Sequence, residues 1–233
     1  MFRRAEDATL DGYVVPSHSG RGLGSALASL GEKRARELGA VSVTTGALSA
    51  DERATQLFSG RGWRRERVFL RMAIDLRGDE EAPDPPPGLS LRNFALEDAR
   101  AFHAATEEAF ADHWDFHPQT FERFHERAIA GEEFDPSLWW LVEDGDEIAA
   151  TIRCTASRFG SGWVNSLAVR RRWRGRGLGK LLLGTAFAEF AGRGEKRVAP
   201  GVDAENPTGA TRLYERVGMR VVYGANLFRK PLG

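Results

Sequence analysis

The sequence is poor in three features that would point to particular classes of protein. It has one cysteine, Cys154, so no intrachain disulfide framework can form. No apolar run approaches the roughly 20 residues that span a bilayer, and no apolar segment of the secretory type follows the first arginines. The 33 Lys and Arg balance the 33 Asp and Glu, which leaves no overall basic footprint for nucleic acid. We therefore expect a cytoplasmic protein without membrane or nucleic-acid partners.

Apolar residues make up 42% of the sequence, which is enough to build a core. Residues 77–88, RGDEEAPDPPPG, interrupt this composition with four acids and four prolines. Such a stretch is typical of a semi-extended spacer. It separates two expected domains, residues 1–76 and residues 89–233.

A glycine-rich phrase occurs twice. GRGLGSALA at 20–28 resembles GRGLGKLLL at 175–183, and LFSGRGW at 57–63 resembles LYERVGM at 213–219. Because the offsets are 155 and 156, the matches indicate internal duplication. The first loop has only 19 residues before it, so residues 1–76 are predicted to be a partial copy, a half-domain.

The hydrophobic periodicity of the larger part predicts a mixed α/β (α+β) domain. The order is strand, two helices, three strands, helix, strand, helix and closing strands from Met219. The expected strands are 89–94, 138–144, 148–157, 162–169 and 197–204, and the expected helices are 97–111, 121–130, 178–191 and 207–217.

The strand that ends at Val169, the loop RGRGLG (174–179) and the following helix form the clearest motif. Glycines let successive backbone N–H groups point into one concavity, and a helix N-terminus adds positive potential, so this is a seat for a pyrophosphate. Side chains at Gly175, Gly177 or Gly179 would fill that seat. A P-loop is excluded because Leu181 stands where Ser or Thr is required, and the spacing of the glycines does not match a dinucleotide fingerprint.

The loop fits the pattern [RQ]-x-x-G-x-[GA], and VDAENPTGATRLYERVGM (202–219) supplies a strand, an Asn and A-x-x-L-Y-x-x-x-G-[FM]. Together they resemble the two signatures of the GCN5-related N-acetyltransferases (GNAT family). The resemblance covers residues 89–233, and the paired copies are similar to the tandem acetyltransferases of this family, the group that includes mycothiol synthase.

The resemblance implies a GNAT fold, a mixed and mostly antiparallel sheet whose two central parallel strands, about 163–169 and 198–204, splay apart. It implies acetyl-CoA as co-substrate and no metal. The pantetheine arm would lie along Leu167, Ala168 and Val169, with main-chain bonds at Leu167 and Val169. Asn206 would contact coenzyme A, and Tyr214 would protonate the leaving thiolate. The pyrophosphate would lie on the loop formed by Arg174, Gly175, Arg176, Gly177, Leu178, Gly179 and Lys180.

The expected reaction is direct attack of a neutral amine on the thioester. Its general base stays open, because Asn165 stands on the strand where family members often have a carboxylate. The candidates are a water chain and the side chains Asp203, Glu205, Asp112 and His113.

Each residue singled out also has a structural reading. Tyr214 and Cys154 could fill the core, and Asn206 could cap its helix. The five arginines of RRRWRGR (170–176) could be solvated or belong to a local phosphate site rather than bind nucleic acid. His113 and His117 lack a third zinc ligand, and we place DHWDFH (112–117) in a loop over the acceptor pocket.

The first copy departs from the family pattern. Ser19 stands in the place of Arg or Gln, and Phe58 in that of the tyrosine. We expect a catalytically silent half-domain that lacks the early strands and both acceptor-side helices and packs on the larger domain or on a second copy in a homodimer. An equally good expectation is that the natural protein is longer and that Met1 is an internal start.

We therefore expect an acetyl-CoA-dependent N-acetyltransferase that acts on a primary amine of a small molecule or peptide. The alternative is a non-catalytic acyl-CoA sensor or interaction module on the same fold.

Overall fold

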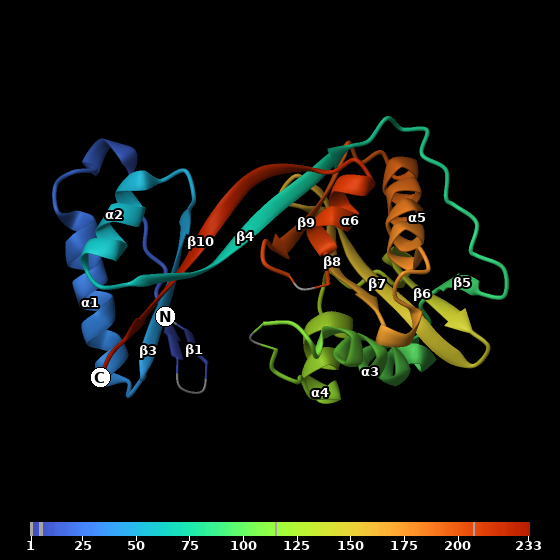
Figure 1. Ribbon diagram of the computed structural model, residues 1–233, viewed down its shortest axis with the longest axis horizontal. Coiled ribbons are helices and arrows are strands. Elements are labelled where there is room, and N and C mark those ends of the chain that lie inside the picture. The colour runs from blue at the N-terminus through green and yellow to red at the C-terminus, as the bar shows by residue number, and fades with distance from the viewer. Residues whose placement is uncertain (1, 5–6, 115, 207) are drawn as a thin grey trace. The chain divides into compact units, whose positions relative to one another are not determined.

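The computed structural model describes residues 2–4, 7–114, 116–206 and 208–233 (Figure 1). The chain forms two compact units. The first comprises residues 1–71, 203–205 and 221–233, and the second comprises residues 72–202 and 206–220. This division differs from the one expected at the linker.

The first unit is a sheet with strand order β1-β2-β3-β10-β4. The closing strand β10 belongs to it because residues 225–231 pair antiparallel with residues 42–48. The expectation that 89–233 is complete by itself is therefore wrong for this strand. The elements are β1 (Phe2–Arg4), β2 (Asp7–Thr9), a 3-10 turn (Pro16–His18), α1 (Leu23–Glu37), β3 (Ser42–Leu48), α2 (Glu52–Gly60), most of β4 (Arg64–Asp75) and most of β10 (Arg220–Pro231).

The second unit is a sheet with strand order β4-β9-β8-β7-β6-β5. Residues 72–75 of β4 extend this sheet beside β9, where the Leu76 amide donates to the Lys196 carbonyl at 2.9 Å. The elements are β5 (Ser90–Asn93), α3 (Ala99–Phe110), α4 (Phe121–Phe124), β6 (Trp139–Asp144), β7 (Glu147–Arg158), β8 (Ser161–Val169), α5 (Leu178–Gly192), β9 (Arg197–Asp203) and α6 (Ala210–Arg216). Short 3-10 or π segments lie at Leu96–Asp98, His125–Ile129, Pro136–Leu138 and Arg171–Trp173.

Helices cover both faces of the second sheet (Figure 1). On one face, α3 buries Phe102, Ala105 and Ala109, and Thr106 of α3 contacts Thr151 of β7 at 3.0 Å. On the other face lies α5, which is mostly apolar and buries nine residues. Because side chains alternate along a strand, Thr151, Arg153 and Thr155 face α3, whereas Ile152 and Cys154 face away from it.

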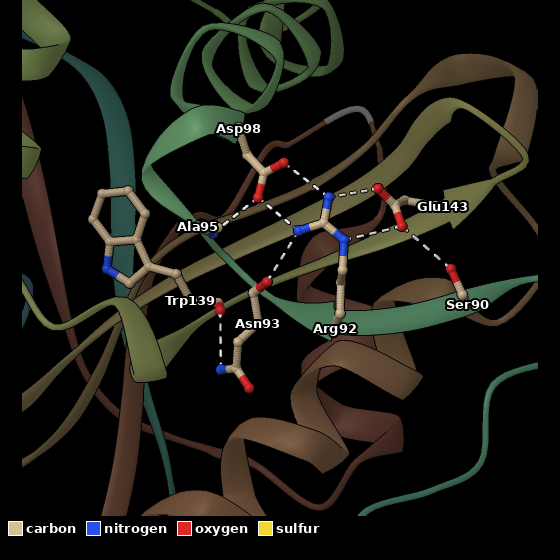
Figure 2. A network of polar contacts seen from close by, with 7 residues as sticks. All are labelled: Ser90, Arg92, Asn93, Ala95, Asp98, Trp139 and Glu143. Atoms are coloured by element: carbon tan, nitrogen blue, oxygen red, sulfur yellow. Dashed lines mark hydrogen bonds and ion pairs between the residues drawn. The ribbon is translucent and has the colours of Figure 1, made fainter.

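The start of α3 is fixed to the sheet by a polar network (Figure 2). The Arg92 guanidinium donates to both carboxylate oxygens of Asp98 at 2.6 and 2.8 Å and to Glu143 at 2.7 and 3.1 Å. Asp98 also accepts from the Ala95 amide at 2.8 Å. These bonds raise the pKa of Arg92 and lower that of Asp98. Arg92, Asp98 and Glu143 therefore stabilise one another in their charged forms.

Most predicted elements are confirmed, and the linker is confirmed to lack helix and strand among residues 77–88. It is more than a spacer, since Pro83 packs so tightly on α5 that a methyl group at Gly184 would lie 2.9 Å from its ring. The expected helix at 207–217 begins at Ala210, with Gly209 as N-cap at φ +75°, and Pro207 lies outside the described residues.

The first unit has a short strand before its glycine loop, in the place that β8 has in the second unit. Residues 7–9 of β2 pair in parallel with residues 42–44 of β3. None of the helices in the part of the chain that the structure describes has the length and hydropathy of a membrane span.

Candidate functional site

The two central parallel strands of the second unit pair over a short distance. The ladder between β8 and β9 joins Gly162 to Val198 and, at its other end, Val164 to Pro200. Among the described residues β8 then continues to Val169 paired with β7 alone. This is the splay that the resemblance implies.

The splay leaves particular main-chain groups facing β9. The Arg170 amide donates to the Ala149 carbonyl on β7 at 3.0 Å. Since main-chain groups alternate between the two edges of a strand, Leu167 and Val169 direct theirs to the other edge. The main-chain N–H and C=O of Ala168 point toward β7, and its side chain is buried.

The loop after β8 has the backbone geometry of an anion seat. Gly175 and Gly177 have φ of +79° and +83°, a region that disfavours side chains, and open space lies where a Cβ would be. Gly177 is the N-cap of α5 without a side-chain cap, so the first N–H groups of the helix, at Leu178, Gly179 and Lys180, lie at an uncapped end. The Leu178 side chain is buried and the Lys180 side chain is exposed.

Gly179 is required for a different reason from the one expected. A Cβ there would lie 2.7 Å from Leu213 of α6. The glycine therefore allows α5 and α6 to approach each other.

The Arg174 side chain folds back onto the protein and stabilises the glycine loop. Its guanidinium donates to the carbonyls of Val169 at 3.2 Å and Ala109 at 3.0 Å, and to Asp112 at 3.2 Å. Its side chain thus ties the loop to the end of β8 and to α3.

The five arginines of residues 170–176 all have carboxylate partners. This accounts for their clustering without nucleic acid, since the five arginines share four carboxylates. The pairs are Arg170 with Glu108, Arg171 with Asp112, Arg172 with Glu147, Arg174 with Asp112, and Arg176 with Asp144.

Tyr214 of α6 is 6% exposed. Burial raises the pKa of its phenol above the ordinary value of 10.0, and the nearby Cys154 thiol raises it further. The hydroxyl therefore carries its proton at neutral pH. Cys154 pairs with Val164, where the β8–β9 ladder ends, so this phenol lies on the α5–α6 face of the splay.

Asn206 lies before α6 and does not cap it. Its Oδ1 accepts from the Thr208 amide at 2.8 Å and from the Thr208 hydroxyl at 2.5 Å, and its Nδ2 lies 3.5 Å from His113 Nε2. The loop before α6 and the 112–117 stretch are therefore adjacent; Asp115 lies outside the described residues.

The candidate bases differ in their surroundings. Arg171 and Arg174 lower the pKa of Asp112, which makes it a weak base. Arg67 pairs with Asp203 and Glu205, which belong to the first unit. Among the described residues no group of three or more His, Cys, Asp or Glu is arranged to hold a metal ion.

One feature of the site gave no signal in the sequence. Arg153 pairs with Ser166, whereas Cys154 pairs with Val164, so Asn165 is an extra residue, a β-bulge, in β8. Asn165 lies in the middle of β8 with no glycine or proline on either side of it, so the sequence gives no sign of the bulge.

Comparison with known proteins gives a consistent family. The model of the Acetyltransferase (GNAT) family matches residues 99–219. Curated relatives named mycothiol acetyltransferase are 35% identical over 88% of this chain in Kineococcus radiotolerans and 32% identical over 88% in Thermobispora bispora. The chain spans 66% and 70% of their lengths.

Solved structures agree. A GCN5-related N-acetyltransferase from Sphaerobacter thermophilus is 37% identical with a TM-score of 0.87, covering 99% of this chain and 74% of its own. A tandem GNAT protein from the clavulanic acid pathway, 17% identical, shares the fold with a TM-score of 0.75 over 98% of this chain and 76% of its own. The family match, the splayed strands and the glycine loop agree, and the chain belongs to the GNAT family of acetyltransferases.

Proposed function

We propose that this chain binds acetyl-CoA in the splay of β8 and β9 and transfers the acetyl group to a primary amine of a small molecule. The observation that carries the proposal is the end of the β8–β9 ladder at Val164. It leaves the main chain of Leu167 and Val169 facing the gap, a few residues before the seat formed by Gly175 and Gly177. The pantetheine arm of acetyl-CoA can form hydrogen bonds with this open main chain, and its diphosphate can bind at the N-terminus of α5.

The reaction follows from the placement of the side chains. The amine nitrogen attacks the thioester carbonyl carbon, the C–N bond forms and the C–S bond breaks. Tyr214 gives its proton to the departing thiolate and is reprotonated from water; burial keeps its phenol protonated at neutral pH but also makes it a weaker acid. The proton of the amine passes to water, since Asp112 is held as an ion by two arginines. Most of the acceleration comes from holding amine and thioester together.

The names of the relatives suggest which acceptor to test first. These relatives are named mycothiol acetyltransferase, so an acceptor of the mycothiol type is the first to test. Action in the cytoplasm and association into a homodimer stay predictions.

We further infer that the first unit is a degenerate, silent copy. Its β2–β3 ladder, 7–9 with 42–44, has the same register as the β8–β9 ladder, 162–164 with 198–200, at the offsets of the sequence repeat. Gly20 and Gly22 repeat the φ angles of Gly175 and Gly177. The position of Tyr214, however, is taken by Phe58.

The test is release of thiol from acetyl-CoA with a panel of primary amines. We expect amine-dependent release and an acetylated product with the wild type. Tyr214→Phe should lose about 100-fold in kcat, whereas Tyr223→Phe, at an exposed tyrosine of β10, should not change it. A protein that binds acetyl-CoA and turns over no amine is a sensor, which would refute the proposed function.

A further inference from the structure

Arg153 of β7 is a half-buried guanidinium without a carboxylate partner among the described residues. Its guanidinium carbon lies 5.6 Å from the centroid of the Trp139 ring, and the charge of Glu133 acts on it without forming an ion pair. Arg92, two strands away, shows the usual arrangement, with Asp98 and Glu143 bonded to it (Figure 2). A partly buried cation that lacks such partners is costly.

The position of Arg153 relates it to the proposed reaction. It pairs with Ser166, the residue after the bulge at Asn165, where β8 has left β9. It lies on the face that Thr151 and Trp139 share with α3, whereas Cys154, whose thiol affects Tyr214, lies on the other face. The leaving thiolate and Arg153 are therefore on opposite sides of the splay, and the α3 side is left for the acceptor.

Two further polar atoms on this part of the sheet lack partners. Oγ1 of Thr155, a side chain 7% exposed, and Oδ1 of Asn165 are buried without a hydrogen bond. Thr155 shares the face of Arg153, and Asn165 is next to the residue paired with Arg153. Native proteins satisfy nearly all buried polar atoms, so two unsatisfied atoms beside the unpaired guanidinium of Arg153 indicate a ligand.

We propose that Arg153, with Thr155 and Asn165, binds an anionic oxygen group, a carboxylate or a phosphate, of the amine acceptor. A planar guanidinium matches such a group with two parallel hydrogen bonds. The Thr155 hydroxyl donates a third bond, and the Asn165 oxygen accepts from the acceptor's amine or a hydroxyl. The inference rests on the proposed function and narrows its acceptor.

The charge of Arg153 supports this assignment. Burial lowers the pKa of its guanidinium, which means that the folded protein places the cation where water stabilises it poorly. A guanidinium is still charged at neutral pH. An anion from the substrate compensates that charge and so gains affinity.

The experiment measures kcat/KM for matched amines: α-amino acids beside their carboxamides, phosphoethanolamine beside ethanolamine, and a neutral acceptor of the mycothiol type. We expect the wild type to prefer the anionic member of one pair by at least about 10-fold, mainly through KM. Arg153→Gln should abolish the preference by losing activity on the anionic member alone, and Arg153→Lys should keep part of it. The two pairs distinguish carboxylate from phosphate.

Arg77→Gln, at an exposed arginine of the linker, is the matched control and should leave the preference unchanged. An unchanged affinity of Arg153→Gln for acetyl-CoA shows that the variant is folded. Turnover without anionic preference, or a preference that survives Arg153→Gln, would overturn this inference and leave the proposed function intact. Absence of turnover with every amine would refute both.

Discussion

Tyr214 and Phe58 show how one position serves two purposes in the two units. Phe58 packs between Trp63 and Phe228, with ring centroids 5.3 Å from each, and so completes the core of the first unit. Tyr214 occupies the corresponding place on α6, but its hydroxyl is buried beside a splayed sheet and keeps its proton. The same helix position thus supplies packing in one unit and, in our proposal, a general acid in the other.

The pH dependence of kcat tests the role of Tyr214. A general acid works in its protonated form, and burial raises the pKa of Tyr214 above 10.0. We therefore expect no alkaline fall of kcat up to pH 10 that depends on this residue. A fall below pH 10 in the wild type that disappears in Tyr214→Phe would contradict the protonated, buried phenol.

At the scale of elements, the N-terminus of α3 depends on ion pairs rather than on packing alone. Asp98 accepts from Arg92 and from the Ala95 amide, and its side chain is 12% exposed. Arg92 is 40% exposed, so solvent screens the pair and reduces its contribution. The network still fixes where α3 begins and hence the face that carries Arg153.

Asp98→Asn should lower the free energy of unfolding by about 1 kcal/mol at pH 7. Because Arg92 lowers the folded-state pKa of Asp98 below 3.8, the stabilisation is present above pH 3.8 and is lost as the pH falls below it. Urea denaturation at several pH values checks this. A difference between variant and wild type that does not shrink in acid would contradict the assignment.

The sequence was sufficient for most elements because their periodicities are strong. The expected helix 178–191 is observed as Leu178–Gly192, and the expected strand 162–169 as Ser161–Val169. The bulge at Asn165 and the ladder ending at Val164 depend on pairing between strands. No local pattern encodes such pairing. The roles assigned to Asn206 and to residues 174–180 remain predictions.

At the scale of the whole molecule, each of the two repeated units includes part of the strand that follows the other unit in the sequence. β4 begins in the first unit and extends the second sheet beside β9, and β10 begins at the end of the second unit and pairs with β3. Sequence order suggested two domains divided at the proline-rich linker. The structure instead places each closing strand in the sheet with which it forms hydrogen bonds. Sequence composition does not show which sheet that is.

Glu32 of α1 holds the exchanged strand β10 in the first unit. This carboxylate is 5% exposed and accepts from Lys230 at 2.8 Å, Trp63 at 3.0 Å and Arg61 at 3.1 Å. Burial opposes its ionisation, but these three donors together lower its pKa. It is therefore charged and fully bonded.

Glu32→Gln should lower the free energy of unfolding by about 2 kcal/mol, because it leaves Lys230 of β10 and the donors Arg61 and Trp63 without an anion. Glu37→Gln is the control, since Glu37 makes exposed pairs with Lys33 and Arg34 and should cost less than about 1 kcal/mol. If denaturant titrations show that both variants lose the same free energy of unfolding, the buried contacts of Glu32 contribute no more than a surface ion pair.

The central claim is that the main chain around Gly177 and the open edge of β8 together hold acetyl-CoA. Isothermal titration calorimetry of acetyl-CoA into the wild type and into Gly177→Val measures this directly. We predict saturable binding to the wild type and loss of binding to the folded variant, because a side chain at φ +83° distorts the seat and occupies it. A folded wild type that gives no heat with acetyl-CoA, or a Gly177→Val variant that binds it equally well, would contradict the account.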